Sequence, residues 1–260
     1  MKNGSVFFEC ARCGFRFYRP ERNPNDQDDL DEFEDAYRQY LEDHPADRAN
    51  HRQVLGWMRA HAAALGSEAL DIGCGSGKFV RFLRANGVDA SGVEPSAPLF
   101  ERYLSKEACF RRTSAEALAA EGKCFAAVTL LDVIEHVESP RAMLRAARDL
   151  LAPGGRLFLS TPDVGSVAAR AAGPRWHFYN KYHLSYLSPR TLEAVCEREG
   201  LRVVSVAHFG KRFPVGYLLR YTRDFLFGGR PQSARKASFL DDVHVPLNLY
   251  DVMYACLERR

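Results

Sequence analysis

The stretch Ala69-Leu70-Asp71-Ile72-Gly73-Cys74-Gly75-Ser76-Gly77 decides the fold of this chain. An apolar strand ends beside an acid, and three alternating glycines follow before a helix that begins at Lys78. Glycines let the backbone approach a ligand closely, and a helix N-terminus presents free N–H groups. The Gly-x-Gly-x-Gly spacing differs from the Gly-x-Gly-x-x-Gly of the dinucleotide fingerprint. We expect a ligand to bind here, at Asp71, Gly73, Cys74, Gly75 and Gly77.

A second acid follows at the end of the next predicted strand. Val88-Asp89-Ala90-Ser91-Gly92-Val93 reads as that strand, and Glu94 comes 23 residues after Asp71. In doubly wound folds an acid about 20 residues beyond the glycine turn accepts hydrogen bonds from ribose hydroxyls. We therefore place a ribose on Glu94, with Pro95 beside it. The alternative is a solvated glutamate at a strand end.

A third group of polar residues follows the buried strand predicted at 124–131. Asp132, Glu135 and His136 come after its last apolar residue, Leu131. Ligands bind at the carboxyl ends of strands in open α/β sheets, so we expect these side chains at the same edge. Taken alone, His136 is equally compatible with a hydrogen-bonded structural histidine.

From residue 67 onward, apolar runs alternate with amphipathic segments, which is typical of a parallel sheet with crossover helices. We divide the chain into a cysteine-bearing segment (1–20), an acidic and then helical segment (21–66) and an α/β domain (67–260) with an insert at about 210–246. The predicted strands are 68–72, 88–93, 109–112, 124–131, 156–160, 201–208 and 249–257.

Composition excludes several classes of protein. The 260 residues are 46% hydrophobic and 27% charged, which is typical of globular chains and not of disordered ones. No apolar run approaches the ~20 residues of a membrane-spanning helix, so we expect no integral membrane association. The start lacks a secretory signal, and seven scattered cysteines favour reduced thiols, so we expect a cytoplasmic protein. The net charge of +3 is too small to indicate nucleic acid, and it conceals an acidic stretch of −9 at 21–47.

Four motifs together carry a family resemblance: Leu70–Gly77, Gly92-Val93-Glu94-Pro95-Ser96, Leu130–Val137 and Leu151-Ala152-Pro153-Gly154-Gly155. They resemble the class I S-adenosylmethionine-dependent methyltransferases, in particular the branch that contains the ubiquinone-biosynthesis O-methyltransferases. The resemblance covers about residues 48–260. It implies a Rossmann-like three-layer sandwich with seven strands, mostly parallel, the last one antiparallel. It also implies S-adenosyl-L-methionine as cofactor, a small-molecule acceptor and methylation of oxygen.

The resemblance implies a role for each matching residue. Asp71 and the three glycines would surround the methionine and ribose parts of the cofactor, with Glu94 on the ribose hydroxyls. Ser114-Ala115-Glu116 falls where the family contacts adenine, although relatives often carry an acid in place of Ser114. Leu131 and Asp132 would face the cofactor from the fourth strand.

A hydroxyl acceptor must lose its proton, which a histidine accepts well near neutral pH. The catalytic candidates are His136, His183 and Glu135, and for either histidine a structural role is an equal alternative. Some relatives hold magnesium with a Glu-x-x-Glu-His pattern, which Asp132, Glu135 and His136 match with aspartate in first place. We do not expect a functional metal there.

Cys10-Ala11-Arg12-Cys13-Gly14 has the sequence of one zinc knuckle. Tetrahedral zinc needs four ligands, and no second Cys-x-x-Cys exists in this chain. A remnant of a zinc ribbon is therefore favoured over bound zinc. The alternatives are a missing upstream segment, ligands from His44 or His51, or a site shared between two chains.

The segment 213–227 reads as an amphipathic helix, which either packs on the domain, covers the acceptor as a lid, or lies on a membrane surface. Several alternatives in function also stay open: a nucleotide-dependent oxidoreductase, a cofactor-binding protein without catalysis, a C- or N-methyltransferase, and a nucleic-acid methyltransferase. We expect no nucleic-acid partner, and a homodimer stays open.

Overall fold

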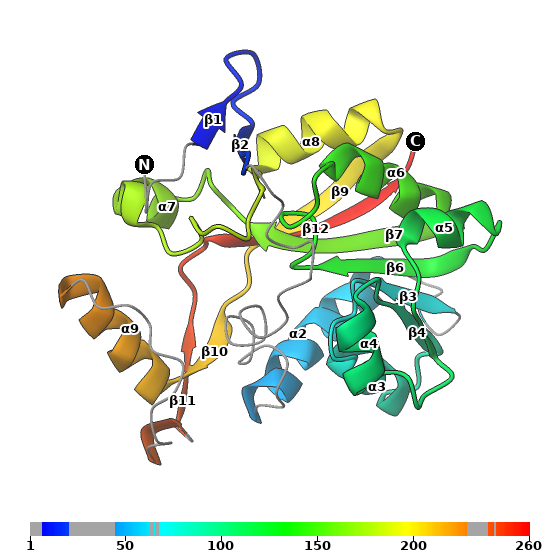
Figure 1. Ribbon diagram of the computed structural model, residues 1–260, viewed down its shortest axis with the longest axis horizontal. Coiled ribbons are helices and arrows are strands. Elements are labelled where there is room, and N and C mark those ends of the chain that lie inside the picture. The colour runs from blue at the N-terminus through cyan, green and yellow to red at the C-terminus, as the bar shows by residue number, and fades with distance from the viewer. Residues whose placement is uncertain (1–6, 21–44, 63–64, 66–67, 228–238, 242) are drawn as a thin grey trace.

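The computed structural model describes residues 7–20, 45–62, 65, 68–227, 239–241 and 243–260. A seven-stranded sheet with the order β5-β4-β3-β6-β7-β12-β9 forms its centre (Figure 1). Every strand runs parallel except the last, β12, which is antiparallel to both of its neighbours. This confirms the predicted sheet. The strands are β3 (Ala69–Ile72), β4 (Ala90–Val93), β5 (Phe110–Arg111), β6 (Phe125–Leu131), β7 (Leu151–Pro162), β9 (Leu201–Ala207) and β12 (Val252–Arg259).

Helices cover both faces of this sheet and bury two apolar cores (Figure 1). On one face lie α5 (Ala115–Ala120), α6 (Pro140–Asp149) and α8 (Pro189–Arg198). On the other lie α2 (Pro45–His61), α3 (Lys78–Ala85) and α4 (Ala97–Tyr103). Burial of their apolar stripes against the strands gives the three-layer sandwich that the sequence predicts.

Serine residues begin four of these helices. The side-chain oxygen of each accepts a backbone N–H of the first helical turn, which satisfies a donor that has no partner within the helix. The four are Ser96 (α4), Ser114 (α5), Ser139 (α6) and Ser188 (α8). Proline follows directly at Pro140 and Pro189, so the predicted start of the helix at Ser188-Pro189 agrees with the structure.

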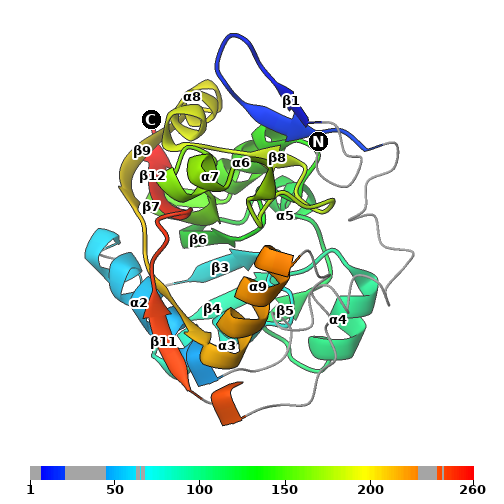
Figure 2. The same cartoon turned by 90° about the vertical axis from the view of Figure 1, so that its left-hand side faces the viewer.

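The C-terminal insert lies at the end of the sheet where the parallel strands finish (Figures 1 and 2). β10 (Lys211–Pro214) pairs antiparallel with β11 (His244–Leu247), and α9 (Val215–Phe227) follows β10. The helix predicted at 213–227 therefore begins two residues later than predicted, because Phe213 and Pro214 belong to the strand pair. β12 also begins three residues later than predicted, since Tyr250 has φ 54°, which a strand does not accommodate.

A hairpin near the N-terminus joins the α/β domain. β1 (Phe7–Glu9) pairs with β2 (Arg16–Tyr18), and β2 pairs with β8 (Ser185–Tyr186), a strand far away in sequence. The ring of Phe7 packs 5.1 Å from Tyr179 and 5.6 Å from Tyr186, measured between centroids. The hairpin is thus part of the structure that holds the segment just before β8.

The remaining elements are α7 (Val167–Ala172), η1 (Gly173–Arg175) and η2 (Phe239–Asp241). Within the described residues, no helix combines the length and the apolar character that crossing a membrane requires. Most of the predicted acidic segment, 21–44, lies outside the described residues.

Candidate functional site

The glycine turn joins β3 to α3 at the carboxyl edge of the sheet. Gly73, Gly75 and Gly77 have φ of 68°, 55° and 76°, the left-handed region that favours glycine. A Cβ atom on Gly77 would lie 2.6 Å from Cζ of Phe110, closer than any tolerated contact. The turn therefore requires glycine both for backbone conformation and for packing.

Asp71 lies at this edge with its side chain enclosed. Asp71 is 5% exposed, and the hydroxyl of Thr129 in β6 donates a 2.5 Å hydrogen bond to Oδ1 of Asp71. Burial, with a smaller contribution from the negative charge of Glu94, raises the pKa of Asp71 from 3.8 to about 7. Such a carboxylate is well placed to attract a cationic ligand.

Glu94, at the end of β4, bridges the glycine turn and the next loop. Its two carboxylate oxygens accept from the backbone N–H groups of Gly75 and Ser96, each at 3.0 Å. Glu94 is 7% exposed, and burial raises its pKa. The structure thus brings Asp71, the glycine turn and Glu94 together, the arrangement expected of a cofactor edge.

In the segment predicted to contact adenine, 114–116, the polar side chain of Ser114 is already used within the fold. The hydroxyl of Ser114 caps α5 by accepting from Ala117 N–H at 3.2 Å. Ala115 is buried, whereas Glu116 and Pro95 are exposed. With Ser114 engaged as a cap, backbone groups and Glu116 remain as the polar groups that this segment offers to a base.

Asp132 follows β6 with a strained backbone, φ 54°, which is uncommon for a residue other than glycine. The hydroxyl of Ser160 donates to its Oδ1 at 2.7 Å, and the ammonium of Lys211 lies 3.2 Å from its Oδ2. The partial burial of Asp132 would by itself raise its pKa, but Lys211 and Ser160 hold that pKa below its ordinary value. The sequence did not predict Lys211, which lies 79 residues away, or Ser160 as partners.

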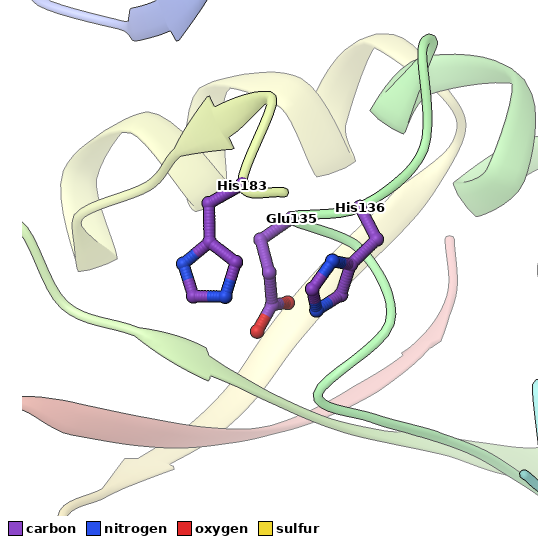
Figure 3. Close-up of side chains that lie close together, drawn as sticks. All are labelled: Glu135, His136 and His183. Carbon is purple, nitrogen blue, oxygen red and sulfur yellow. The ribbon is translucent and has the colours of Figure 1, made fainter. Parts of the chain in front are cut away.

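Three side chains converge beyond Asp132. Glu135, His136 and His183 each place a ligand-type atom within 4.8 Å of the other two, and the Glu135 carboxylate lies between the imidazole rings (Figure 3). Burial, together with the charge of Asp132, raises the pKa of Glu135 to about 8, and burial lowers the pKa of His136 to about 4. Burial also holds the pKa of His183 well below its usual value. The three predicted catalytic candidates therefore form one cluster.

This arrangement differs from the magnesium set implied by the resemblance. Asp132 is held by Ser160 and Lys211, and among the described residues the converging group takes His183 in its place. Magnesium prefers an octahedron of oxygens, which one carboxylate and two imidazoles do not supply. The residues present do not fit magnesium, and no step of the chemistry below depends on it.

Cys10 and Cys13 occupy the tip of the N-terminal hairpin. Cys10 N–H donates to the Phe15 carbonyl and Gly14 N–H to the Cys10 carbonyl, both at 2.8 Å, which closes a tight turn. Hydrogen bonds from the backbone of Cys13 and Arg12, and from the Cys13 side chain, lower the pKa of Cys10. Within the described ranges no third ligand-type side chain joins the pair. His51 packs between Phe79 and Phe82 instead, and His44 lies outside the described residues.

The family described as "Methyltransferase domain" matches residues 42–206. The chain belongs to the class I S-adenosylmethionine-dependent methyltransferases. Its curated relatives include the ubiquinone biosynthesis O-methyltransferases of Azoarcus sp. (30% identical over 173 residues, 59% of this chain and 72% of the relative) and Azotobacter vinelandii (30% over 168 residues, 57% and 70%). That of Dinoroseobacter shibae is 35% identical over 156 residues, which are 54% of this chain and 61% of the relative.

Solved structures show the same fold for this methyltransferase. A SAM-dependent methyltransferase from Archaeoglobus fulgidus has a TM-score of 0.56 at 16% identity and covers 90% of this chain and all of its own. The magnesium protoporphyrin IX methyltransferase of Synechocystis, solved with bound S-adenosylhomocysteine, has a TM-score of 0.56 at 15% identity, with 88% and 94% covered. The family thus confirms S-adenosylmethionine as cofactor and excludes the oxidoreductase alternative.

Proposed function

We propose that this methyltransferase transfers the methyl group of S-adenosylmethionine to a hydroxyl oxygen of a small molecule. The observation that carries the proposal is the cluster of Glu135, His136 and His183 beyond the end of β6, in which Glu135 and His183 are buried and His136 is partly buried. Transfer to a hydroxyl releases a proton, and this cluster provides groups that accept one. The curated relatives, which are O-methyltransferases by name, support the same choice of acceptor atom.

The cofactor would lie along the edge formed by Asp71, the glycine turn and Glu94. Glu94 would accept from the ribose hydroxyls, and the ionised Asp71 would favour the positive charge of the sulfonium end. Leu131 and Asp132, at the end of β6, would lie between this edge and the cluster. The cofactor would then present its methyl group toward Glu135, His136 and His183.

The hydrogen bond between His136 and Tyr182 supports a part for His136 as the group that accepts the proton. Its Nδ1 lies 3.0 Å from the carbonyl of Tyr182, and because a carbonyl only accepts, Nδ1 donates and Nε2 keeps its lone pair. As the acceptor oxygen bonds to the methyl carbon, the C–S bond breaks and its electron pair stays on sulfur. The hydroxyl proton passes to Nε2 of His136. Placing the reactants in line supplies most of the catalysis in such displacements.

The experiment that tests this function is a transfer assay with methyl-13C-labelled cofactor and paired acceptors. The two acceptors of a pair share the same ring or chain, and one carries a hydroxyl where the other carries an amine. The hydroxyl acceptors include catechol-type compounds and alkyl alcohols. We expect label in an O-methyl resonance and a large loss of turnover in His136→Gln with S-adenosylhomocysteine binding retained. Label only in N-methyl or C-methyl products would contradict the proposal and favour the alternative acceptor atoms.

A further inference from the structure

The cluster of Glu135, His136 and His183 has the donor atoms of a metal site. One carboxylate and two imidazoles face one another within 4.8 Å, and they come from two segments that are 47 residues apart (Figure 3). Zinc bonds to nitrogen at about 2.1 Å, so modest side-chain rotation brings donors at this separation around one centre. Three protein ligands with a fourth position open is the usual pattern of a catalytic zinc site.

Backbone hydrogen bonds hold the two segments together without any metal. The carbonyl of Glu135 accepts from Leu184 N–H at 2.7 Å and from Ser185 N–H at 3.2 Å. Ser185 also donates its hydroxyl to the carbonyl of Ile134 at 3.3 Å. The ligand positions are therefore fixed by the fold, which lowers the cost of bringing donors together.

The orientation of His136 matches that of a metal ligand. Metal-binding histidines almost always donate their second ring N–H to a carbonyl or carboxylate, which fixes the tautomer. His136 donates from Nδ1 to the Tyr182 carbonyl, which leaves Nε2 as the donor atom. His183 is held at the turn beside it, where Asn180 Oδ1 accepts from the backbone N–H groups of Tyr182 and His183.

Glu135 is the second, independent observation. The residue is 1% exposed, and within the described part of the chain its Oε2 atom has no hydrogen-bond partner. A buried polar atom without a partner lowers the stability of the folded protein. Such an atom, directed into a group of potential ligands, indicates that something else binds it.

We propose that Glu135, His136 and His183 bind one divalent cation of the borderline class represented by zinc, and not magnesium. Two imidazoles with one carboxylate suit zinc and other late first-row divalent metals, whereas magnesium needs oxygen ligands. Asp132, the residue that would make the set richer in oxygen, is engaged by Lys211 and Ser160. With a metal bound, Nε2 of His136 would be a ligand and would not accept the hydroxyl proton. The metal would instead lower the pKa of an acceptor hydroxyl at its open position, and the proton would leave to solvent. This consequence alone rests on the proposed function.

The test is calorimetric titration of tag-free, chelator-treated full-length protein with zinc and, separately, with magnesium. Because the thiols of Cys10 and Cys13 are potential zinc ligands outside this cluster, the parent protein for this experiment carries Cys10→Ser and Cys13→Ser. We expect one zinc per chain, binding at least about tenfold tighter than magnesium. His183→Gln should weaken the binding of zinc by at least about tenfold. Its binding of S-adenosylhomocysteine, measured in parallel, shows that it remains folded.

Asp132→Asn is the matched control, since it removes a carboxylate next to the cluster and outside it. We expect Asp132→Asn to weaken zinc binding much less than His183→Gln does, because Asp132 acts on the cluster through its charge and not as a ligand. Zinc uptake lost in Asp132→Asn but kept in His183→Gln, tighter binding of magnesium, or no zinc uptake at all would overturn the proposal. Cobalt provides a second readout, because a site without cysteine shows no thiolate-to-cobalt charge-transfer band. These readouts measure metal uptake, so a failure of the O-methylation proposal leaves them unaffected.

Discussion

The ammonium of Lys211 lies 3.2 Å from the carboxylate of Asp132, so the C-terminal insert contacts the residue that follows the end of β6. The side chains of Lys211 and Asp132 are 26% and 41% exposed, and solvent screens the pair, so its contribution to stability is less than about 1 kcal/mol. Because Lys211 lowers the pKa of Asp132, that contribution is present at neutral pH and is lost as pH falls through the pKa of folded Asp132.

Replacement of Lys211 by methionine should therefore destabilise the protein slightly at pH 7. We expect a loss below about 1 kcal/mol in urea unfolding, and the loss should shrink in 1 M salt because screening weakens the native pair. Arg212→Met is the control, since it removes an exposed cation from the next position of β10. An equal loss in both variants would show that the Lys211–Asp132 contact contributes nothing specific.

Asp71→Asn should stabilise the cofactor-free protein and weaken its binding of the cofactor. Burial makes the charged form of Asp71 unfavourable, so the neutral amide should raise Tm at pH 8 by roughly 2–8 °C, equivalent to about 1–2 kcal/mol. Affinity for S-adenosylmethionine in calorimetry should fall at least about tenfold. Asp89→Asn, which changes an exposed acid paired with Arg84, should leave both measurements unchanged.

The pH dependence of cofactor binding should follow Asp71. Its pKa in the folded protein is about 7, against 3.8 ordinarily, and the cationic cofactor favours the ionised form. Affinity should fall as pH is lowered from 8 to 6, approaching tenfold per pH unit below 7. For the cofactor-free protein the sign is opposite: the contribution of Asp71 to the free energy of unfolding falls as pH rises from 3.8 to about 7. Asp71→Asn should remove both slopes.

Substitutions at Gly77 and Gly122 distinguish the cost of backbone strain from the cost of a packing clash. Gly77 and Gly122 have nearly equal φ, 76° and 75°, but a Cβ on Gly122 meets nothing within 4 Å, whereas one on Gly77 overlaps the ring of Phe110. Gly122→Ala should cost roughly 1–2 kcal/mol for the left-handed backbone alone. Gly77→Ala should cost about 1–3 kcal/mol more in urea unfolding. Equal losses would mean that the helix entry adjusts freely.

Sequence patterns predicted the sheet well because its strands and helices are encoded locally. The Asp71–Gly77 turn and Glu94 needed only spacing and residue type. The partners of Asp132 were missed because Lys211 approaches from a strand pair that no local periodicity predicts. The pairing of β2 with β8 was missed for the same reason, since two-residue and three-residue strands leave no pattern.

The catalytic candidates were predicted as residues, but their grouping was not. Residue type predicted Glu135, His136 and His183 individually, and the motif around His136 also suggested Asp132 as a companion. Only the fold shows that the carbonyl of Glu135 accepts from the backbone next to His183, which brings the two segments together. The choice between Asp132 and His183 was therefore beyond sequence alone.

The most direct test of the central claim is a crystal structure of the full chain with S-adenosylhomocysteine. We expect the ribose hydroxyls on Glu94, the glycine turn against the homocysteine part, and the sulfur facing the cluster of Glu135, His136 and His183. A ribose bound away from Glu94, or a sulfur atom separated from the cluster by protein side chains, would contradict the proposed site and the transfer chemistry derived from it.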